Sequence, residues 1–317
     1  MDKTIDQVGS NDSLQEGSGI AAVERDTGIG KDTLRVWERR YGFPQPLRDP
    51  LGERVYPAEQ VARLRLIKRL MDQGGRPGKL LAAPVDELQR LVALPDADVA
   101  TTATSAAADD LVRHLRTGNA ELVRQDLGQR LAREGLQRFV CSSVPELNRC
   151  IGEAWAAGRI EIFEEHLYTE LMQMQLRAAI HALPRADRPP AVLLTTVSGE
   201  EHLLGLLMAE ALLTAEGARC VSIGAQTPVA DIALAARSVE AQVVALSFSI
   251  AYPWRKARDA LLGLRRRLDA GVEVWVGGGN LHRHRKHLDG IRTFASLDEI
   301  PEAVTAWRAR RAAAQDA

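Results

Sequence analysis

The chain has 317 residues, of which 45% are hydrophobic and 26% charged, a balance that excludes wholesale disorder and predicts two or three globular domains. Lys and Arg number 41 and Asp and Glu 42, a net charge of −1, so the total charge points to no particular partner. Three cysteines without C-x-x-C spacing exclude a disulfide scaffold, and the longest apolar stretch, residues 203–213, is too short for a membrane span.

Residues 1–17 are polar, and we expect them to be disordered and to hold no signal peptide. Together with the lack of a membrane span, this predicts a cytoplasmic protein without a membrane partner. Residues 18–79 carry 13 basic and 8 acidic side chains, a net charge of +5. A basic segment on an acidic body fits a head that binds a polyanion, although charge alone favours a solvated basic face.

The pattern inside this segment predicts a winged helix-turn-helix. Two short helices are expected at residues 20–25 and 31–41, with a glycine-containing turn between them. The second helix of such a motif lies in the major groove of DNA. Residues 42–56 are rich in proline and glycine and predict a wing, after which Pro57 opens a helix to about residue 72.

The stretch T-L-R-V-W-E-R-R-Y-G-F-P-Q-P-L-R, followed by G-E-R-V-Y, resembles the winged-helix head of MerR-family transcription regulators. The resemblance assigns residues 18–90 to a head that binds double-stranded operator DNA, with Trp37 in its core. Pattern and resemblance together give a DNA-facing set of Thr33, Arg35, Arg39, Arg40, Tyr41, Arg48, Arg54 and Tyr56. Residues 74–78 hold three glycines and Pro77. They interrupt the long dimerising helix of that family, so oligomerisation is expected to come from elsewhere.

The middle of the chain is predicted to be helical. Residues 91–106 are expected to be a linker, and residues 107–186 show apolar positions at helical spacing that fit a four-helix bundle. Nine residues separate Trp155 from the pair Glu165 and His166. On spacing alone, this acidic residue and histidine are a surface pair or a satisfied core histidine rather than a ligand site.

Residues 187–317 predict an α/β domain. Buried strands are expected at residues 191–197, 219–223, 243–247, 272–276 and 291–294, with helices between most of them. This alternation predicts a doubly wound parallel sheet of flavodoxin-like type. The fold class is therefore multidomain α and α/β. Ligands of such sheets bind beyond the carboxyl ends of the strands.

Chemically useful residues follow three of these strands. His202 can present a neutral imidazole to a metal, and Glu200 can take the proton of the other ring nitrogen. The remaining residues at this edge are Gly205 after the first strand, Ser247 and Ser249 after the third, and Gly277 and Gly278 after the fourth. No G-x-G-x-x-G follows the first strand, which argues against a dinucleotide site.

The motifs E-x-H-x-x-G, S-x-S and G-G resemble the cobalamin-binding domain shared by methionine synthase and related mutases. The resemblance implies that His202 is the lower cobalt ligand and Glu200 its hydrogen-bond partner, where those enzymes usually have aspartate. Gly205 then gives room at the helix start. Ser247 and Ser249 line the slot for the displaced base of the cofactor, and Gly277 and Gly278 border it.

The motif W-x9-E-H, behind a MerR-type head and before a cobalamin domain, resembles the CarH/LitR type of light-responsive regulators. The resemblance implies that Trp155, Glu165 and His166 cover the upper face of adenosylcobalamin. The dark tetramer would bind operator DNA and repress, and light would break the cobalt–carbon bond and release the DNA. A histidine is expected beside the tryptophan, but the residue is Ala156, so His166 or water would take the vacated cobalt face.

Two alternatives remain open from the sequence. One is a light-independent MerR-type regulator that senses cobalamin or another ligand. The other is a corrinoid methyltransferase module, which the DNA-binding head and the absence of a substrate barrel disfavour, so we expect a protein that is not an enzyme. The basic tract of residues 282–287 holds three histidines. A solvated patch or an interface explains it better than a zinc site, because its neighbours are cationic.

Overall fold

The computed structural model describes residues 17–72, 77–93, 102–184, 187–279 and 281–315. The predicted disorder of residues 1–16 and the interruption at residues 74–76 lie outside the described residues. The chain divides into two compact units. We call residues 1–112 with 150–165 the head unit, and residues 113–149 with 166–317 the sheet unit.

The head unit contains the predicted helix-turn-helix and wing. The first helix ends at Gly28, which has a φ of +66° and donates its N–H to the Glu24 carbonyl oxygen. The second helix has the predicted bounds. The elements are β1 (Ser18–Gly19), α2 (Ile20–Thr27), α3 (Lys31–Tyr41), β2 (Leu47–Arg48), β3 (Arg54–Tyr56), α4 (Ala58–Asp72), α5 (Pro77–Ala82) and α6 (Val85–Ala93). Strands β1, β3 and β2 pair antiparallel in that order, and the β2–β3 hairpin is the wing.

One apolar cluster holds the head together. Leu34 and Trp37 of α3 pack in it with Leu64 and Ile67 of α4. Trp37 is buried, which confirms the predicted core role. The spacing of three or four residues puts each pair on one helix face, so α3 and α4 bury the same cluster from two helices.

Helices make up the middle of the chain, as expected. They are α7 (Thr102–Arg116), α8 (Ala120–Glu134), α9 (Leu136–Arg138), the π-helix η1 (Phe139–Ser143), α10 (Val144–Ala156) and α11 (Ile162–Ala182). Helices α9, η1 and α10 follow one another without a break, so the region has the four helical segments predicted. Helix α7 begins inside the segment expected to be a linker, of which residues 94–101 lie outside the described residues. Within the sheet unit, the Tyr168 hydroxyl donates to Asn148 Oδ1 at 2.6 Å and joins α11 to α10.

The C-terminal domain is the predicted parallel sheet. Its strands are β4 (Arg188–Thr195), β5 (Ala218–Ser222), β6 (Val243–Phe248), β7 (Glu273–Gly278) and β8 (Ile291–Thr293). All pairings are parallel, in the order β5-β4-β6-β7-β8. This is the flavodoxin-like order, whose switch point lies between the first and third strands of the domain. Successive strands are therefore added on opposite sides of β4, and a ligand is expected at the switch point between β4 and β6.

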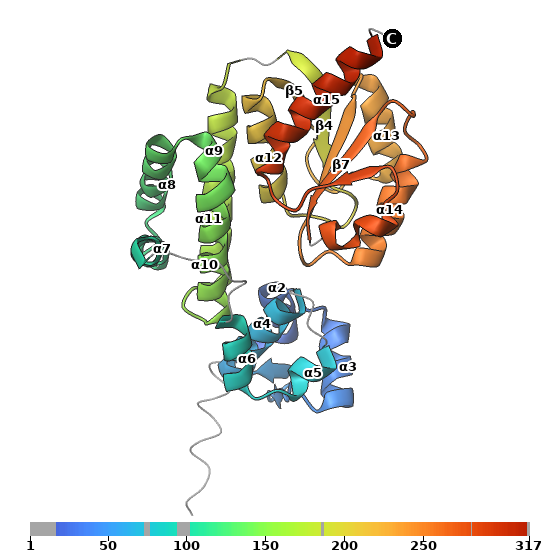
Figure 1. Cartoon of the computed structure of the whole chain (residues 1–317). Helices are drawn as coiled ribbons and strands as arrows, with labels where there is room; N and C mark the ends of the chain where they lie inside the picture. The colour runs from blue at the N-terminus through green and yellow to red at the C-terminus, as the bar shows by residue number, and fades with distance from the viewer. Residues whose placement is uncertain (1–16, 73–76, 94–101, 185–186, 280, 316–317) are drawn as a thin grey trace, which may run out of the picture. The chain divides into compact units, whose positions relative to one another are not determined.

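Helices cover both faces of the sheet (Figure 1). Helices α12 (Leu204–Ala215) and α15 (Glu299–Gln315) lie on one face, and α13 (Val229–Ser238) and α14 (Trp254–Arg265) lie on the other. Leu246 and Val276 pack with α13 and α14. Because side chains alternate along a strand, Ser247 and Gly277 face the α12 side. Trp275 and Trp307 are buried. None of the described helices is long and apolar enough to cross a membrane.

Candidate cofactor site and DNA-binding face

One buried carboxylate joins two loops at the carboxyl edge of the sheet. Glu200 lies between β4 and α12 and is only 1% exposed. Its Oε1 accepts the backbone N–H of His202 at 3.0 Å and lies 2.6 Å from His202 Nδ1. Its Oε2 accepts the N–H of Ser249 at 2.7 Å and the Ser249 hydroxyl at 2.8 Å. The loop after β4 and the loop after β6 are therefore tied together by one side chain.

These hydrogen bonds keep Glu200 ionised. Burial alone would raise the pKa of this carboxyl, but the donors on His202 and Ser249 stabilise the charged form and lower the pKa to about 2. Because the pKa is lowered, ionised Glu200 stabilises the fold at every pH above the ordinary carboxyl pKa. This contribution is lost as the pH falls from that ordinary value toward 2. The site therefore holds a fixed negative charge at neutral pH.

The ionised carboxylate determines how His202 can act. A carboxylate can only accept hydrogen bonds, so Nδ1 of His202 must carry a proton and donate it. In the neutral ring, the lone pair then lies on Nε2, the nitrogen that a metal ion binds. The imidazole is 67% exposed although its partner is buried. The arrangement presents an oriented nitrogen ligand at the switch point of the sheet.

Other residues that the sequence did not single out hold this loop in place. The Thr196 hydroxyl donates to the Glu200 carbonyl oxygen at 2.5 Å and accepts the N–H of Gln226. The Tyr252 hydroxyl donates to the carbonyl oxygen of Ser198 at 3.0 Å. A threonine at the end of a buried strand was the only available signal, and it does not identify its partners.

Small residues leave room beside the Glu200–His202 pair. A Cβ atom at Gly205 would lie 2.6 Å from Ser247 Oγ, so the start of α12 lies close to the Ser247 hydroxyl of β6 and a side chain there would make that hydroxyl turn away. A Cβ atom at Gly277 would meet no atom within 4 Å. At Gly278, φ is +80° and an added Cβ would overlap the Phe248 carbonyl oxygen. Glycine is thus required by close approach at position 278, whereas position 205 lies against the Ser247 hydroxyl and position 277 opens onto space beside Ser247.

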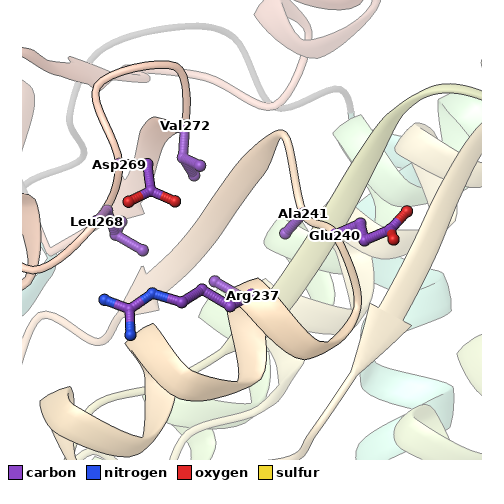
Figure 2. A pocket seen from close by; sticks show the side chains of 7 residues that line it. Arg237, Glu240, Ala241, Leu268, Asp269 and Val272 are labelled. Atoms are coloured by element: carbon purple, nitrogen blue, oxygen red, sulfur yellow. The ribbon is translucent and has the colours of Figure 1, made fainter.

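These features fit a bulky metal-containing cofactor. A group with an axial metal would find the oriented imidazole of His202 at the edge. The open position beside Gly277 offers a place for a long substituent between the sheet and α12. By contrast, a cleft of 280 Å³ lies at the amino edge of the sheet, where Ala241 precedes β6 and Val272 precedes β7. Figure 2 shows that Arg237, Glu240 and Asp269 give its rim charges of both signs, which suits an apolar cofactor face poorly.

The residues expected on the upper cofactor face are divided between the two units. Trp155 and Glu165 belong to the head unit, and His166 belongs to the sheet unit. Trp155 is half-buried against the apolar cluster of the head. Glu165 is half-buried and His166 is exposed. Successive helical residues point about 100° apart, so Glu165 and His166 present different faces of α11.

The expected DNA-facing residues lie mostly on the outside of α3 and the wing. Thr33, Arg39 and Arg40 are exposed on α3, and the Arg40 guanidinium lies 5.3 Å from the centroid of the Tyr41 ring. Arg35 is also exposed and pairs with Asp32 at 3.1 Å. In the wing, Arg48 donates to the Gly52 carbonyl oxygen at 2.6 Å, and this bond fixes the shape of the turn.

Arg54 and Tyr56 are less exposed than the other members of this set. Arg54 Nε donates to Glu38 Oε2 of α3 at 2.9 Å and ties the wing to the helix. Tyr56 has 0% exposure and packs in the core of the head, so the expectation that it faces DNA is wrong. Burial raises the pKa of its hydroxyl. Residues two apart on a strand share one face, and this face of β3 turns toward the protein.

The tract of residues 282–287 forms the 3-10 helix η2 (Leu281–His287). Its His284 ring stacks on Trp254, with centroids 4.1 Å apart and planes 15° apart. Among the described residues, no group of three or more His, Cys, Asp or Glu side chains is placed to hold a metal ion.

Comparison with known families matches each of these parts. The family described as MerR HTH family regulatory protein matches residues 19–78. Two families described as B12 binding domain match residues 107–180 and 190–296. The fold and the site therefore define a transcription regulator with a DNA-binding head and a cobalamin-binding body.

Relatives with known names narrow this class. The HTH-type transcriptional repressor CarH of Myxococcus xanthus is 30% identical over 273 residues, which are 81% of this chain and 87% of CarH. The HTH-type transcriptional repressor CarA of the same organism is 31% identical over 296 residues, 91% of this chain and 95% of CarA. The chain belongs to this CarH/CarA family of transcriptional repressors.

A solved structure supports the fold of the cobalamin-binding part. The monomethylamine corrinoid protein of Methanosarcina barkeri has a TM-score of 0.51 and 16% sequence identity, and it covers 63% of this chain and 97% of its own. At this identity the likeness shows the fold alone, and the transcriptional role rests on the family.

The role of the buried carboxylate can be tested by substitution. Glu200→Gln is expected to weaken cobalamin binding about 10- to 100-fold, because residues that orient a metal ligand typically contribute that much. The amide would also turn a donor toward either His202 or Ser249, which both donate to the carboxylate. The measurement is a cobalamin titration followed by absorption. Glu201→Gln at the exposed neighbour is the matched control. Equal affinities of the two variants for cobalamin would contradict the claim that Glu200 orients His202.

The DNA-binding face can be tested without knowing the operator. Arg39→Ala is expected to weaken binding to a random-sequence duplex about tenfold, since a charge-assisted contact to phosphate contributes about 1.4 kcal/mol. The slope of log affinity against log salt should also fall by about 1. Fluorescence anisotropy at several salt concentrations gives both values. Arg124→Ala on α8, outside the head, should bind as the wild type does, and an unchanged slope for Arg39→Ala would remove this arginine from the interface.

Proposed function

We propose that the chain is a light-sensing repressor that depends on adenosylcobalamin. The observation that carries the proposal is the buried Glu200 holding an exposed His202 at the switch point of the sheet. This pair belongs to the same chain as a MerR-type head. The names of CarH and CarA support repression as the direction of control. In this proposal, the form in the dark is a tetramer that binds operator DNA.

The lower face of the cofactor is assigned to the sheet unit. His202 would bind cobalt through Nε2, with Glu200 fixing the ring and Ser249 holding Glu200. Ser247 and Gly277 would line the slot for the displaced base, next to the glycine at the start of α12. When bound, adenosylcobalamin supplies a cobalt–carbon bond that visible light breaks. The chain's own residues bind and orient the group and respond to loss of the adenosyl moiety.

The upper face is assigned to Trp155, Glu165 and His166. The indole offers a flat apolar surface for the adenine ring, and the carboxylate offers acceptors for the ribose hydroxyls. Loss of the adenosyl moiety would remove these contacts, and the bundle would then be free to leave its dark position. The two states would differ in the packing that the adenosyl moiety favours, as any ligand-driven switch requires.

Illumination of the loaded protein tests the proposal. The protein is saturated with adenosylcobalamin in darkness and then exposed to visible light. We expect a change in the absorption spectrum, a fall in molar mass by light scattering and a loss of affinity for operator DNA selected from random duplexes. A spectral change with unaltered mass and DNA affinity would contradict the switch.

A light-independent cobalamin sensor is the second candidate, and Ala156 is the observation that favours it. A methyl group cannot bind cobalt after the adenosyl moiety has left. After illumination, residue 156 therefore supplies no ligand to the cobalt. DNA affinity measured in darkness without cobalamin, with adenosylcobalamin and with hydroxocobalamin separates the candidates. A sensor of cobalamin itself responds equally to both forms, whereas the light switch responds to the adenosyl form alone.

A further inference from the structure

The segment that carries Trp155 is built into the DNA-binding head. Residues 150–165 cluster with residues 1–112 in one compact unit. Ala156 is 1% exposed and lies in the same apolar cluster as Leu64 and Ile67 of α4. A larger polar side chain at position 156 would have to enter this apolar core. The packing thus gives a physical reason for alanine at the position where the resemblance predicts a histidine.

Arg65 of α4 is the centre of this contact. Its side chain is only 9% exposed. The Nη2 atom donates to Asp26 Oδ2 at 2.8 Å and to Glu161 Oε2 at 3.1 Å. The guanidinium carbon lies 5.9 Å from the centroid of the Trp155 ring, within the range of a cation–π contact. The buried guanidinium of Arg65 therefore contacts the helix-turn-helix through Asp26 and contacts residues 150–165 through Glu161 and Trp155.

A second ion pair fixes the same docking. Arg69, one turn further along α4, pairs with Glu153 of α10 at 3.1 Å. Buried charges are costly unless they are paired, so the two arginines specify one arrangement of the segment against α4. Among the described residues, the buried Nε1 of Trp155 has no hydrogen-bond partner. An unsatisfied buried donor destabilises the docked position, and the indole is thus held by its neighbours rather than by its own polar atom.

We infer that Arg65 couples the cofactor to the DNA-binding head through an exchange of the Trp155 indole, which either packs on Arg65 or covers the adenosyl moiety. The inference rests on the proposed function in one respect, the role of Trp155 on the upper face. Docked on the head, the indole restrains α4, which begins two residues after the last strand of the wing. Drawn to the adenosyl moiety, it leaves α4 and the wing free to adapt to DNA.

Thermodynamic linkage makes this exchange measurable. If docking competes with adenosyl binding, whatever weakens docking must strengthen adenosylcobalamin binding by the same factor. Glu161 is suited to the test because its side chain is 59% exposed and Arg65 keeps Asp26 when Glu161 is removed. The head therefore retains its buried ion pair, and the variant is expected to fold.

The experiment compares three proteins and two ligands in darkness. Adenosylcobalamin and hydroxocobalamin are titrated into the wild type, Glu161→Ala and the control Glu59→Ala, which removes an exposed carboxylate from the first turn of α4. Circular dichroism checks the fold. Glu161→Ala is expected to bind adenosylcobalamin about two- to fivefold more tightly, the range of a partly exposed ion pair. Its affinity for hydroxocobalamin should be unchanged, and Glu59→Ala should match the wild type. Glu153→Ala, which removes the second ion pair, should act in the same direction as Glu161→Ala.

The outcomes separate the inference from the function on which it rests. A wild type that prefers adenosylcobalamin, together with a Glu161→Ala variant of equal affinity, would overturn the coupling and leave the function intact. Equal tightening for both cobalamins would also overturn it, because the adenosyl moiety would then have no part in the exchange. If the wild type binds both cobalamins equally, the proposed function fails and the inference fails with it.

Discussion

His202→Ala is expected to lower cobalamin affinity by at least about 100-fold, because the groups that merely orient a metal ligand already contribute 10- to 100-fold. The side chain is largely exposed, so its removal takes little packing from the fold. Glu200 would still accept the N–H of residue 202 and both donors of Ser249. The buried carboxylate therefore remains satisfied, and the loss should be confined to the cofactor.

Gel filtration followed by absorption measures the cobalamin that each protein retains. His181→Ala is the matched control, since this histidine is exposed on α11 and its Nδ1 contacts the Arg177 carbonyl oxygen. The control should retain cobalamin as the wild type does. Undiminished retention by His202→Ala would remove this residue as the cobalt ligand.

Two adjacent glycines are expected to give opposite results when each is replaced by alanine. Gly278→Ala should lower the free energy of unfolding by about 3 kcal/mol or more, because φ is +80° and the methyl group would overlap the Phe248 carbonyl oxygen. Gly277→Ala should leave the stability of the cobalamin-free protein within about 0.5 kcal/mol of the wild type, since its methyl group meets no atom within 4 Å. The same methyl group would occupy the proposed slot and lower cobalamin affinity about tenfold or more.

Urea unfolding without cobalamin and a cobalamin titration of the folded variant provide the two measurements. Each glycine serves as the control for the other, since both substitutions add one methyl group to β7. Full cobalamin affinity in Gly277→Ala would show that the cofactor does not use this space, and unchanged stability in Gly278→Ala would contradict the close approach to β6.

Elements with strong local signals were predicted well from the sequence. Glycine stands on both sides of residues 31–41, and the apolar positions between them repeat at helical spacing, so α3 has the expected bounds. The strands expected at residues 191–197, 219–223 and 243–247 match β4, β5 and β6 within a few residues. The carboxyl edge follows from this alternation, and with it the position of His202.

Contacts between distant residues were not available from the sequence. Ser249 was expected to line a slot, and the sequence did not show that its N–H and hydroxyl both donate to Glu200, 49 residues away. Tyr56 shares a strand with the basic residue Arg54, yet the Tyr56 side chain is buried in the core. Trp155 lies on an amphipathic helix, and only the folded chain shows that its ring packs with Arg65 of the head. In each case the partner is set by tertiary packing, which leaves no periodic signal.

Electron paramagnetic resonance on isotope-labelled protein tests most directly whether His202 binds cobalt. The protein is produced with ¹⁵N-labelled histidine, loaded with cobalamin of natural isotope content and reduced to the cobalt(II) state. A ¹⁴N axial ligand splits each cobalt line into three, whereas a ¹⁵N ligand splits it into two. We predict doublets in the labelled wild type and their loss in His202→Ala. Triplets in the labelled wild type would show that the cofactor keeps its own base, and the account of His202 as the cobalt ligand would be wrong.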